Sequence, residues 1–192
     1  DEHGILLILD EVQCGVGRTG KFFAHEWSGI TPDIMMVAKG IGGGFPLGAV
    51  LATENAAFGM TAGTHGSTYG GNPLACAVGC SVVDHIADPS FLEDVRRKSA
   101  LLMQSLQSLS ASHPEIFEDV RGYGLMLGLK CKLKNSKVLA ACYAQELITV
   151  PAADNVIRLL PPLNLSDEEI AQAILRLDNA ANTFKETLEE TT

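Results

Sequence analysis

The sequence lacks an excess of positive charge and lacks any long apolar run, and each absence excludes a class of protein. Its 192 residues contain 14 lysines and arginines against 23 aspartates and glutamates, which gives a formal net charge of −9. An acidic chain without a basic stripe argues against nucleic-acid binding. No apolar run reaches the ~18 residues of a membrane-spanning helix. We therefore expect neither a nucleic-acid partner nor a membrane partner.

The sequence also lacks a cysteine framework. Its five cysteines are scattered, and none of them forms a C-x-x-C pair. An odd, unpatterned set of cysteines fits a reducing compartment, so we predict a cytoplasmic protein. Cys76 and Cys80 lie four residues apart on an expected helix, but no pair of histidines completes a zinc set. We expect these two cysteines to be small core residues, and we expect no metal site.

Short apolar runs separated by glycine-rich loops indicate an α/β fold in the first half. GILLIL, which starts at Gly4, is typical of a buried parallel strand, and DIMMVAKG (33–40) and AVLAT (49–53) indicate two more strands. Asn72 is an expected N-cap, and a closely packed helix of small residues follows it over 74–86. Since a buried parallel strand needs neighbours on both sides, we expect the chain to be a piece of a longer protein.

The second half has a different, α+β character. An amphipathic helix is expected over 90–110, with an apolar side formed by Leu92, Val95, Leu102, Leu106 and Leu109. IFEDVRGYGLMLGLKCKL (116–133) predicts two strands, SKVLAACYAQEL (136–147) a helix, and TVPAADNVIRLLPPLNL (149–165) a hairpin-like pair. Ser166 and Glu169 form a capping box that opens the last helix. We place the domain boundary near Asp88, with domains over 1–88 and 89–192.

Two nucleotide-binding patterns overlap in LLILDEVQCGVGRTGKF (6–22). Gly15, Gly17 and Gly20 spell G-x-G-x-x-G, and residues 15–21 spell a phosphate loop without its last residue. A dinucleotide fingerprint needs a helix that starts inside the motif, and no long amphipathic pattern follows Gly20. In the phosphate loop, Phe22 replaces the Ser or Thr that would hold magnesium. We therefore favour neither pattern.

A third interpretation starts from two side chains at strand ends. Asp10 ends one apolar run, and Lys39 ends another directly before a glycine-rich loop. Ligands of α/β sheets bind at the carboxyl ends of strands. A lysine buried there would be costly unless its amine loses its charge and forms a Schiff base. Schiff-base lysines of pyridoxal enzymes work with an acid that holds the pyridinium nitrogen, and Asp10 can be that acid.

Three blocks of the sequence resemble class III pyridoxal-phosphate-dependent aminotransferases. They are LLILDEVQCGVGRTGKFFAHE (6–26), PDIMMVAKGIGGGFPLGAV (32–50) and HGSTYGGNPLACAV (65–78), and VRGYGLMLGLK with TVPAADNVIRLLPPLNLSDEEI resembles the acetylornithine aminotransferase branch. The resemblance covers essentially the whole chain and matches the C-terminal part of such an enzyme. It implies fold-type I, with the later part of the large cofactor domain over 1–88 and the small C-terminal domain over 89–192. The absent N-terminal part would complete the same enzyme.

The resemblance also implies roles for residues of the cofactor site. Lys39 would form the Schiff base with pyridoxal 5'-phosphate and then move protons on the substrate. Asp10 would bond the protonated ring nitrogen, so that the ring can withdraw electrons. Glu11 and Val12 would belong to the cofactor-contacting stretch, with Val12 packed on one ring face. Gln13 would lie near the ring hydroxyl, although a plain turn residue is the alternative.

More distant residues receive roles from the same resemblance. Thr68 would reach the phosphate bound to the other subunit of a homodimer, and Ser67 would lie near the substrate. Arg158 would clamp the substrate α-carboxylate, because a guanidinium fits a carboxylate bidentately. An ordinary turn for Ser67 and Thr68 and a structural salt bridge for Arg158 stay open. Arg18 and Thr19 receive structural or interface roles only.

The implied reaction transfers an amino group in two halves. N-acetylornithine, ornithine or a related ω-amino acid would give its terminal amino group to the cofactor, and 2-oxoglutarate would take it, as a step of arginine biosynthesis. Other ω-amino substrates stay open, as does a class III decarboxylase or racemase. The alternative from another functional class is an inactive truncated fragment. We expect the 192 residues alone to show no turnover.

Overall fold

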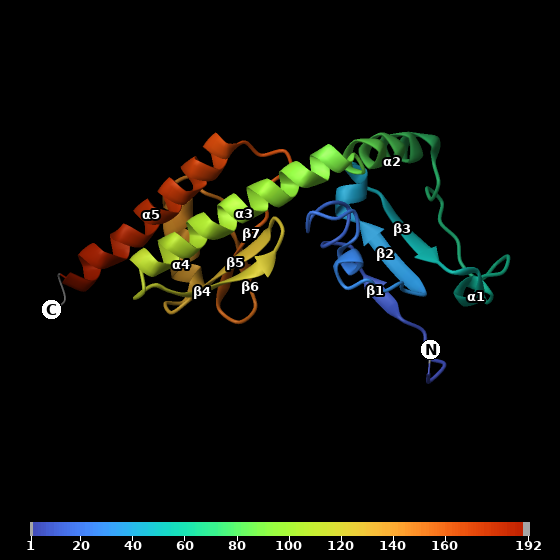
Figure 1. Ribbon diagram of the computed structural model, residues 1–192, viewed down its shortest axis with the longest axis horizontal. Coiled ribbons are helices and arrows are strands. Elements are labelled where there is room, and N and C mark those ends of the chain that lie inside the picture. The colour runs from blue at the N-terminus through green and yellow to red at the C-terminus, as the bar shows by residue number, and fades with distance from the viewer. Residues whose placement is uncertain (1, 190–192) are drawn as a thin grey trace. The chain divides into compact units, whose positions relative to one another are not determined.

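The computed structural model describes the backbone of residues 2–189 and the side chains of residues 2–184. The chain forms two compact units that divide between Asp94 and Val95, inside a long helix. The α-helices and β-strands of each unit are labelled in Figure 1.

The first unit is built on a three-stranded sheet in the order β1-β2-β3. Its strands are β1 (Ile8–Asp10), β2 (Ile34–Ala38) and β3 (Gly48–Ala52). β1 runs parallel to β2, with Asp10 opposite Met36, whereas β3 runs antiparallel to β2. Met35 and Val37 of β2 are buried, in agreement with the apolar run that predicted this strand. Both other strands lie at an edge of the sheet.

The expectation that GILLIL forms one buried strand is wrong. The strand begins only at Ile8, and Ile5 is 75% exposed. Leu6, Leu7 and Ile8 are exposed as well. The physical reason is the place of β1 in the sheet, because it pairs with β2 on one side and has no second strand on the other side among the described residues. An apolar strand with one neighbour keeps much of its surface in contact with solvent.

Helix α2 (Pro73–Ile86) begins as the sequence predicts. The Asn72 side chain accepts a hydrogen bond from the Ala75 N–H at 2.9 Å, and proline occupies the first helical position. The small residues allow close packing, since a Cβ at Gly79 would lie 2.7 Å from Leu47 Cδ2. Cys76 and Cys80, however, are exposed, so the prediction that they are core residues is wrong for this chain.

Three short helical segments complete the first unit. They are the 3-10 helices η1 (Ala24–Trp27) and η2 (Lys39–Gly42) and the single turn α1 (Glu54–Ala57). Thr53 caps α1 through its hydroxyl, which accepts from the Ala56 N–H. Between α1 and α2 the chain makes an irregular excursion over residues 58–72, in which nearly all side chains are exposed.

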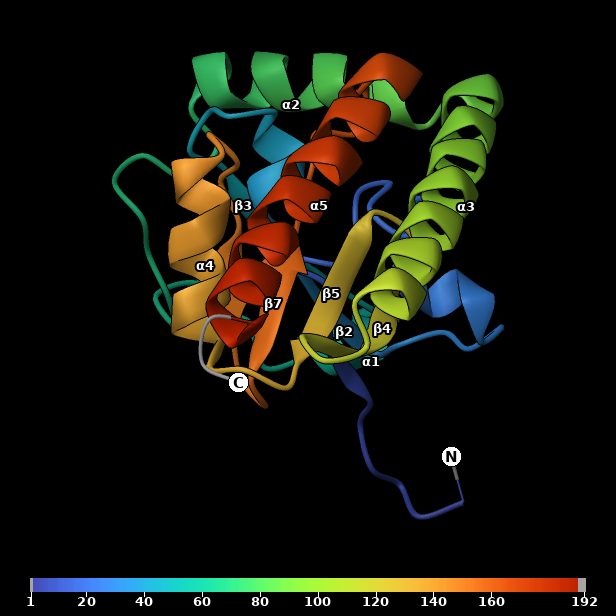
Figure 2. The same ribbon diagram turned by 90° about the vertical axis from the view of Figure 1, so that its left-hand side faces the viewer.

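The second unit is a four-stranded antiparallel sheet with helices on one face (Figure 2). The sheet order is β4-β5-β7-β6. Its strands are β4 (Phe117–Tyr123), β5 (Met126–Cys131), β6 (Val150–Ala152) and β7 (Val156–Leu159). The helices are α3 (Pro89–Ser112), α4 (Asn135–Ala144) and α5 (Asp167–Glu189). The predicted strand pair, middle helix and hairpin are therefore confirmed.

The core of this unit lies between the helices and the sheet. α3 contributes Val95, Leu102, Leu106 and Leu109, all buried, and β5 and β7 contribute Leu127, Leu129, Ile157 and Leu159. The capping box of the last helix is present: the Ser166 N–H donates to Glu169 Oε2 at 2.6 Å, and the Glu169 N–H donates to Ser166 Oγ at 3.1 Å. No helix within the described part of the chain has both the length and the apolar character to cross a membrane.

Candidate active site

Asp10 and Lys39 lie at the carboxyl ends of two neighbouring parallel strands. Asp10 ends β1, and Lys39 follows Ala38, the last residue of β2. Because β1 and β2 run parallel with Asp10 opposite Met36, both residues belong to the same edge of the sheet. The segments that follow the two strands also touch each other. A Cβ at Gly40, which follows β2, would lie 3.2 Å from the Cβ of Val16, which follows β1. This edge therefore brings together the two residues that the sequence singled out.

Lys39 is exposed, so the expectation of a lysine buried in the strand core is wrong. It lies one residue beyond β2, at the start of η2, where the chain leaves the sheet. Its φ angle is 50°, in the left-handed region that side chains other than glycine rarely adopt. Such backbone strain clusters at functional sites. The strained turn is therefore evidence, independent of burial, that Lys39 is a functional residue.

The Asp10 carboxylate is exposed and held by its own loop. Its Oδ1 accepts a hydrogen bond from the Val12 N–H at 2.9 Å, and the Cys14 thiol donates to the Asp10 carbonyl at 3.6 Å. Burial and the neighbouring Glu11 raise the pKa of the Cys14 thiol, which keeps this group neutral beside the two carboxylates. Val12 and Gln13 are half-buried in the same loop. The backbone after β1 thus fixes the orientation of Asp10.

The glycines that imitate nucleotide-binding motifs have local roles. A Cβ at Gly15 would lie 2.8 Å from the Glu11 carbonyl oxygen, so only glycine fits there. Gly17 and Gly20 have φ angles of 83° and 87°, which glycine adopts without strain. The four-residue η1 is the next helical element. The segment is a compact turn and not the strand-to-helix crossover of a dinucleotide site.

Residues 18–27 stiffen this turn. Thr19 is buried, and the Trp27 Nε1–H donates to its hydroxyl at 3.2 Å. The Lys21 ammonium lies 4.8 Å from the centre of the Trp27 ring. Burial lowers the pKa of the Arg18 guanidinium. The structural or interface roles expected for Arg18 and Thr19 stay predictions.

Ser67 and Thr68 lie on the exposed excursion before α2. The Ser67 hydroxyl accepts a hydrogen bond from the Gly70 N–H at 2.9 Å, which closes a local turn. Thr68 is exposed beside it. Their roles toward substrate and phosphate stay predictions.

Arg158 belongs to the second unit, unlike the other predicted site residues. It lies on β7 between Gly128 of β5 and Val150 of β6, and it is half-buried. Its neighbours Ile157 and Leu159 point into the core under the helices, so alternation along the strand places Arg158 on the opposite sheet face. A role for Arg158 at the edge that carries Lys39 stays a prediction.

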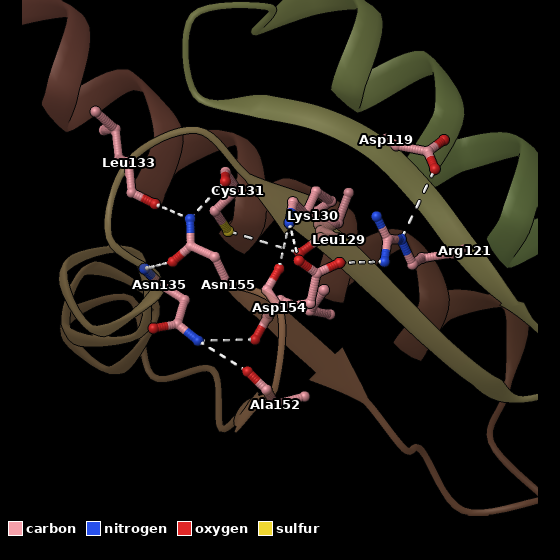
Figure 3. Close-up of polar contacts among 11 residues, drawn as sticks. Asp119, Arg121, Leu129, Lys130, Cys131, Leu133, Asn135, Ala152, Asp154 and Asn155 are labelled. Carbon is pink, nitrogen blue, oxygen red and sulfur yellow. Dashed lines mark hydrogen bonds and ion pairs between the residues drawn. The ribbon is translucent and has the colours of Figure 1, made fainter.

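The structure shows two polar arrangements that sequence reasoning missed. In the first unit, Glu11 is buried and bonded to His25. In the second, Asp154 accepts from Lys130 and Arg121, and both cations lower the pKa of its carboxyl (Figure 3). The adjacent Asn155 accepts from the Asn135 N–H at the start of α4 and donates to the Leu133 carbonyl just before that helix. Both arrangements join residues that are distant in sequence. For the bond between Glu11 and His25, the sequence signal that could have shown it is the second acid directly after Asp10.

Comparisons with known proteins agree with this geometry. Residues 1–181 match the family model described as Aminotransferase class-III. The chain is 66% identical to the acetylornithine aminotransferase of Rhodobacter capsulatus over 185 residues, which are 96% of this chain and 47% of that protein. It is 45% identical to the acetylornithine aminotransferase of Clostridium acetobutylicum over 175 residues, or 91% and 45% of the two chains. The chain spans about half the length of the curated relatives it matches.

Solved structures show the same similarity. The N-acetylornithine aminotransferase of Stenotrophomonas maltophilia matches with a TM-score of 0.86 and 37% identity, over 97% of this chain and 50% of that one. An ornithine aminotransferase of Plasmodium yoelii matches with a TM-score of 0.88 and 29% identity, over 95% and 49%.

The fold is therefore that of the fold-type I pyridoxal-phosphate-dependent transferases, as the sequence predicts. Within that class, the chain belongs to the class III aminotransferase family, whose members depend on pyridoxal phosphate.

Proposed function

We propose that this chain supplies the catalytic lysine and the ring-binding aspartate of an aminotransferase that uses N-acetylornithine or a related ω-amino acid as donor and 2-oxoglutarate as acceptor. The observation that carries the proposal is the placement of Asp10 and Lys39 at adjacent ends of parallel strands. The substrate class follows the names of the relatives, which are acetylornithine and ornithine aminotransferases. The reaction would belong to arginine biosynthesis in the cytoplasm.

The residues at this edge suit pyridoxal phosphate chemically. A carboxylate suits a protonated pyridine nitrogen, and a primary amine suits an aldehyde. When bound, the cofactor supplies an electron-withdrawing ring that stabilises negative charge on the substrate. Asp10 holds the proton on the ring nitrogen. The Lys39 amine would attach the cofactor. Once the substrate has displaced it, the amine would carry the proton between the substrate carbon and the cofactor carbonyl carbon, in one direction in the first half of the reaction and in the other direction in the second.

The remaining roles complete the proposal. Arg158 binds the substrate carboxylate, Ser67 lies near the substrate, and Thr68 donates to the phosphate held by the partner subunit of a homodimer. Residues 1–88 form the later part of the large cofactor domain, and 89–192 form the small C-terminal domain. An N-terminal half of the kind present in the relatives supplies the other contacts. Glu11, Val12 and Gln13 form the stretch beside the cofactor.

The test uses a joined enzyme, in which the N-terminal half of the Rhodobacter capsulatus relative precedes this chain. Incubation with pyridoxal phosphate, borohydride reduction and peptide mapping should place the label on Lys39. Lys21 and Lys130 are the internal controls, since they hold other contacts. A label on either control in place of Lys39 contradicts the assignment.

A substrate panel on the joined enzyme then separates the reactions. Glutamate should form from 2-oxoglutarate with N-acetylornithine or ornithine as donor. Preference for another ω-amino acid would revise the donor only. Labelled Lys39 without transfer from any donor would favour a decarboxylase, a racemase or an inactive chain.

A further inference from the structure

Glu11, the residue directly after Asp10, is a buried carboxylate. Only 3% of it is exposed, although it lies where β1 leaves the sheet. Its Oε2 accepts from the Ala24 N–H at 2.7 Å, and its Oε1 accepts from the His25 N–H and from His25 Nδ1, both at 2.8 Å. Since a carboxylate only accepts, Nδ1 carries the hydrogen. These three bonds offset the cost of burying the charge.

These contacts tie the two ends of the loop over residues 12–23 together. The Glu11 N–H donates to the Met36 carbonyl at 2.9 Å, which anchors its backbone to β2. The loop closes tightly over its side chain, because a Cβ at Gly15 would lie 3.0 Å from Oε2. The same loop presses Val16 against Gly40, the residue after Lys39. Glu11 therefore fixes the loop that lies between the Asp10 end and the Lys39 turn.

The orientation of Asp10 depends on this anchor. Side chains of successive residues in extended backbone point to opposite faces, so a Glu11 side chain held inside directs Asp10 outward. The bond from the Val12 N–H to Asp10 Oδ1 then fixes the carboxylate on that outer side. Val12 has this position because the loop that begins with it is held at its far end by Glu11.

We propose that Glu11, together with His25, is a positioning residue that aims the Asp10 carboxylate at the ring nitrogen of the cofactor. The inference rests on the proposed function and deepens it. Glu11 itself does not touch the ring through its carboxylate, which the backbone and imidazole of residues 24 and 25 occupy. Loss of the anchor should weaken only those interactions that pass through Asp10.

The experiment compares two ligands on the joined enzyme without cofactor. One is pyridoxal phosphate, and the other is its analogue with carbon in place of the ring nitrogen. Glu11→Gln puts an amide N–H against a backbone N–H and should lower the affinity for pyridoxal phosphate about tenfold, the value of one charged hydrogen bond. Its affinity for the carbon analogue should stay within about twofold of the parent. Asp10→Asn should show the same selectivity, and the double variant should bind no more weakly than Asp10→Asn alone.

Glu26→Gln is the matched control. Glu26 also accepts from the backbone of this loop, at the Phe23 N–H, but it is exposed and not adjacent to Asp10. The Glu26→Gln enzyme should bind both ligands as tightly as the parent enzyme does. If the Glu11→Gln variant does not fold, the His25→Gln variant is tested with the same two ligands. This variant removes the imidazole from Glu11 and leaves both backbone hydrogen bonds to the Glu11 carboxylate in place.

The outcomes are distinct. Equal losses for both ligands would make Glu11 a general structural residue, and unchanged binding of both would deny it any role at the site. Either result overturns the inference. If the parent itself binds neither ligand, the proposed function fails, and this failure is separate from a loss of selectivity in the variants.

Discussion

At the scale of single residues, Asp10 should decide the rate of the reaction more than the stability of the fold. Its carboxylate is exposed and accepts a hydrogen bond from the Val12 N–H, so an amide can replace it without a buried charge being lost. Asp10→Asn removes the negative charge that keeps the ring protonated. We expect kcat/KM of the joined enzyme to fall by about 10³-fold or more, because the loss acts on the transition state. Activity within tenfold of the parent, with an unchanged melting temperature, would show that Asp10 is structural.

The cysteines give a second prediction at this scale. Burial raises the pKa of the Cys131 thiol to about 11, and burial also raises that of Cys142. A raised pKa removes the thiolate at pH 8, and the thiolate is the species that reacts. In the native chain, iodoacetamide at pH 8 should therefore modify the exposed Cys76 and Cys80 and spare Cys131 and Cys142. Mass mapping should find all of them modified in urea, and fast native labelling of Cys131 would contradict its buried position.

At the scale of elements, the turn between β4 and β5 depends on a glycine inside β4. Gly122 has a φ of 125°, and a Cβ there would lie 2.1 Å from the Met126 carbonyl oxygen. Gly122→Ala must separate two paired strands, so we expect a loss of about 3 kcal/mol or more in the free energy of unfolding. Gly66→Ala is the control, because a Cβ at Gly66 meets nothing within 4 Å. Equal urea midpoints for the two variants would contradict the prediction.

Elements that depend on local signals were predictable from the sequence. Asn72 before proline marked the start of α2, and the capping box at Ser166 marked the start of α5. The apolar runs also located β2 and the strand pair β4 and β5. These signals act over a few residues, so the sequence around each position is sufficient to show them.

Burial and distant contacts were not predictable in the same way. The continuous apolar run GILLIL indicated a strand buried between two neighbouring strands, but β1 pairs with a single strand in the described structure. Asp10 and Lys39 could be assigned to strand ends, whereas the bonds from Glu11 to Ala24 and His25 depend on how the loop folds back. Periodicity gives no information about what packs on a strand or which side chains a loop brings together.

At the scale of the whole molecule, the first unit exposes an apolar strand edge. Ile5, Leu6, Leu7 and Ile8 are exposed, and every residue of β3 is exposed as well. Exposed edges of this kind associate. We expect the chain on its own to sediment as a mixture of oligomers and to show no turnover, and coexpression with the N-terminal half of the relative to suppress the association. A stable monomer at micromolar concentration, or measurable transamination by the chain alone, would contradict this expectation.

The proposed homodimer raises the question of which subunit Thr68 serves. Thr68 is exposed on the excursion between α1 and α2, well removed in sequence from Lys39. Thr68→Ala should weaken cofactor binding by about 1–3 kcal/mol, the cost of leaving a charged acceptor one donor short. At a cofactor level where neither Lys39→Ala nor Thr68→Ala dimers are active, the two variants are mixed and allowed to exchange subunits. If Thr68 acts across the interface, the mixed dimer holds both lesions in one site and leaves the other intact. Activity per mixed dimer then rises to about half of the parent's, since one of two independent sites works. If Thr68 serves its own subunit, each site keeps one lesion and the mixture stays inactive, which would exclude a phosphate contact from the partner subunit.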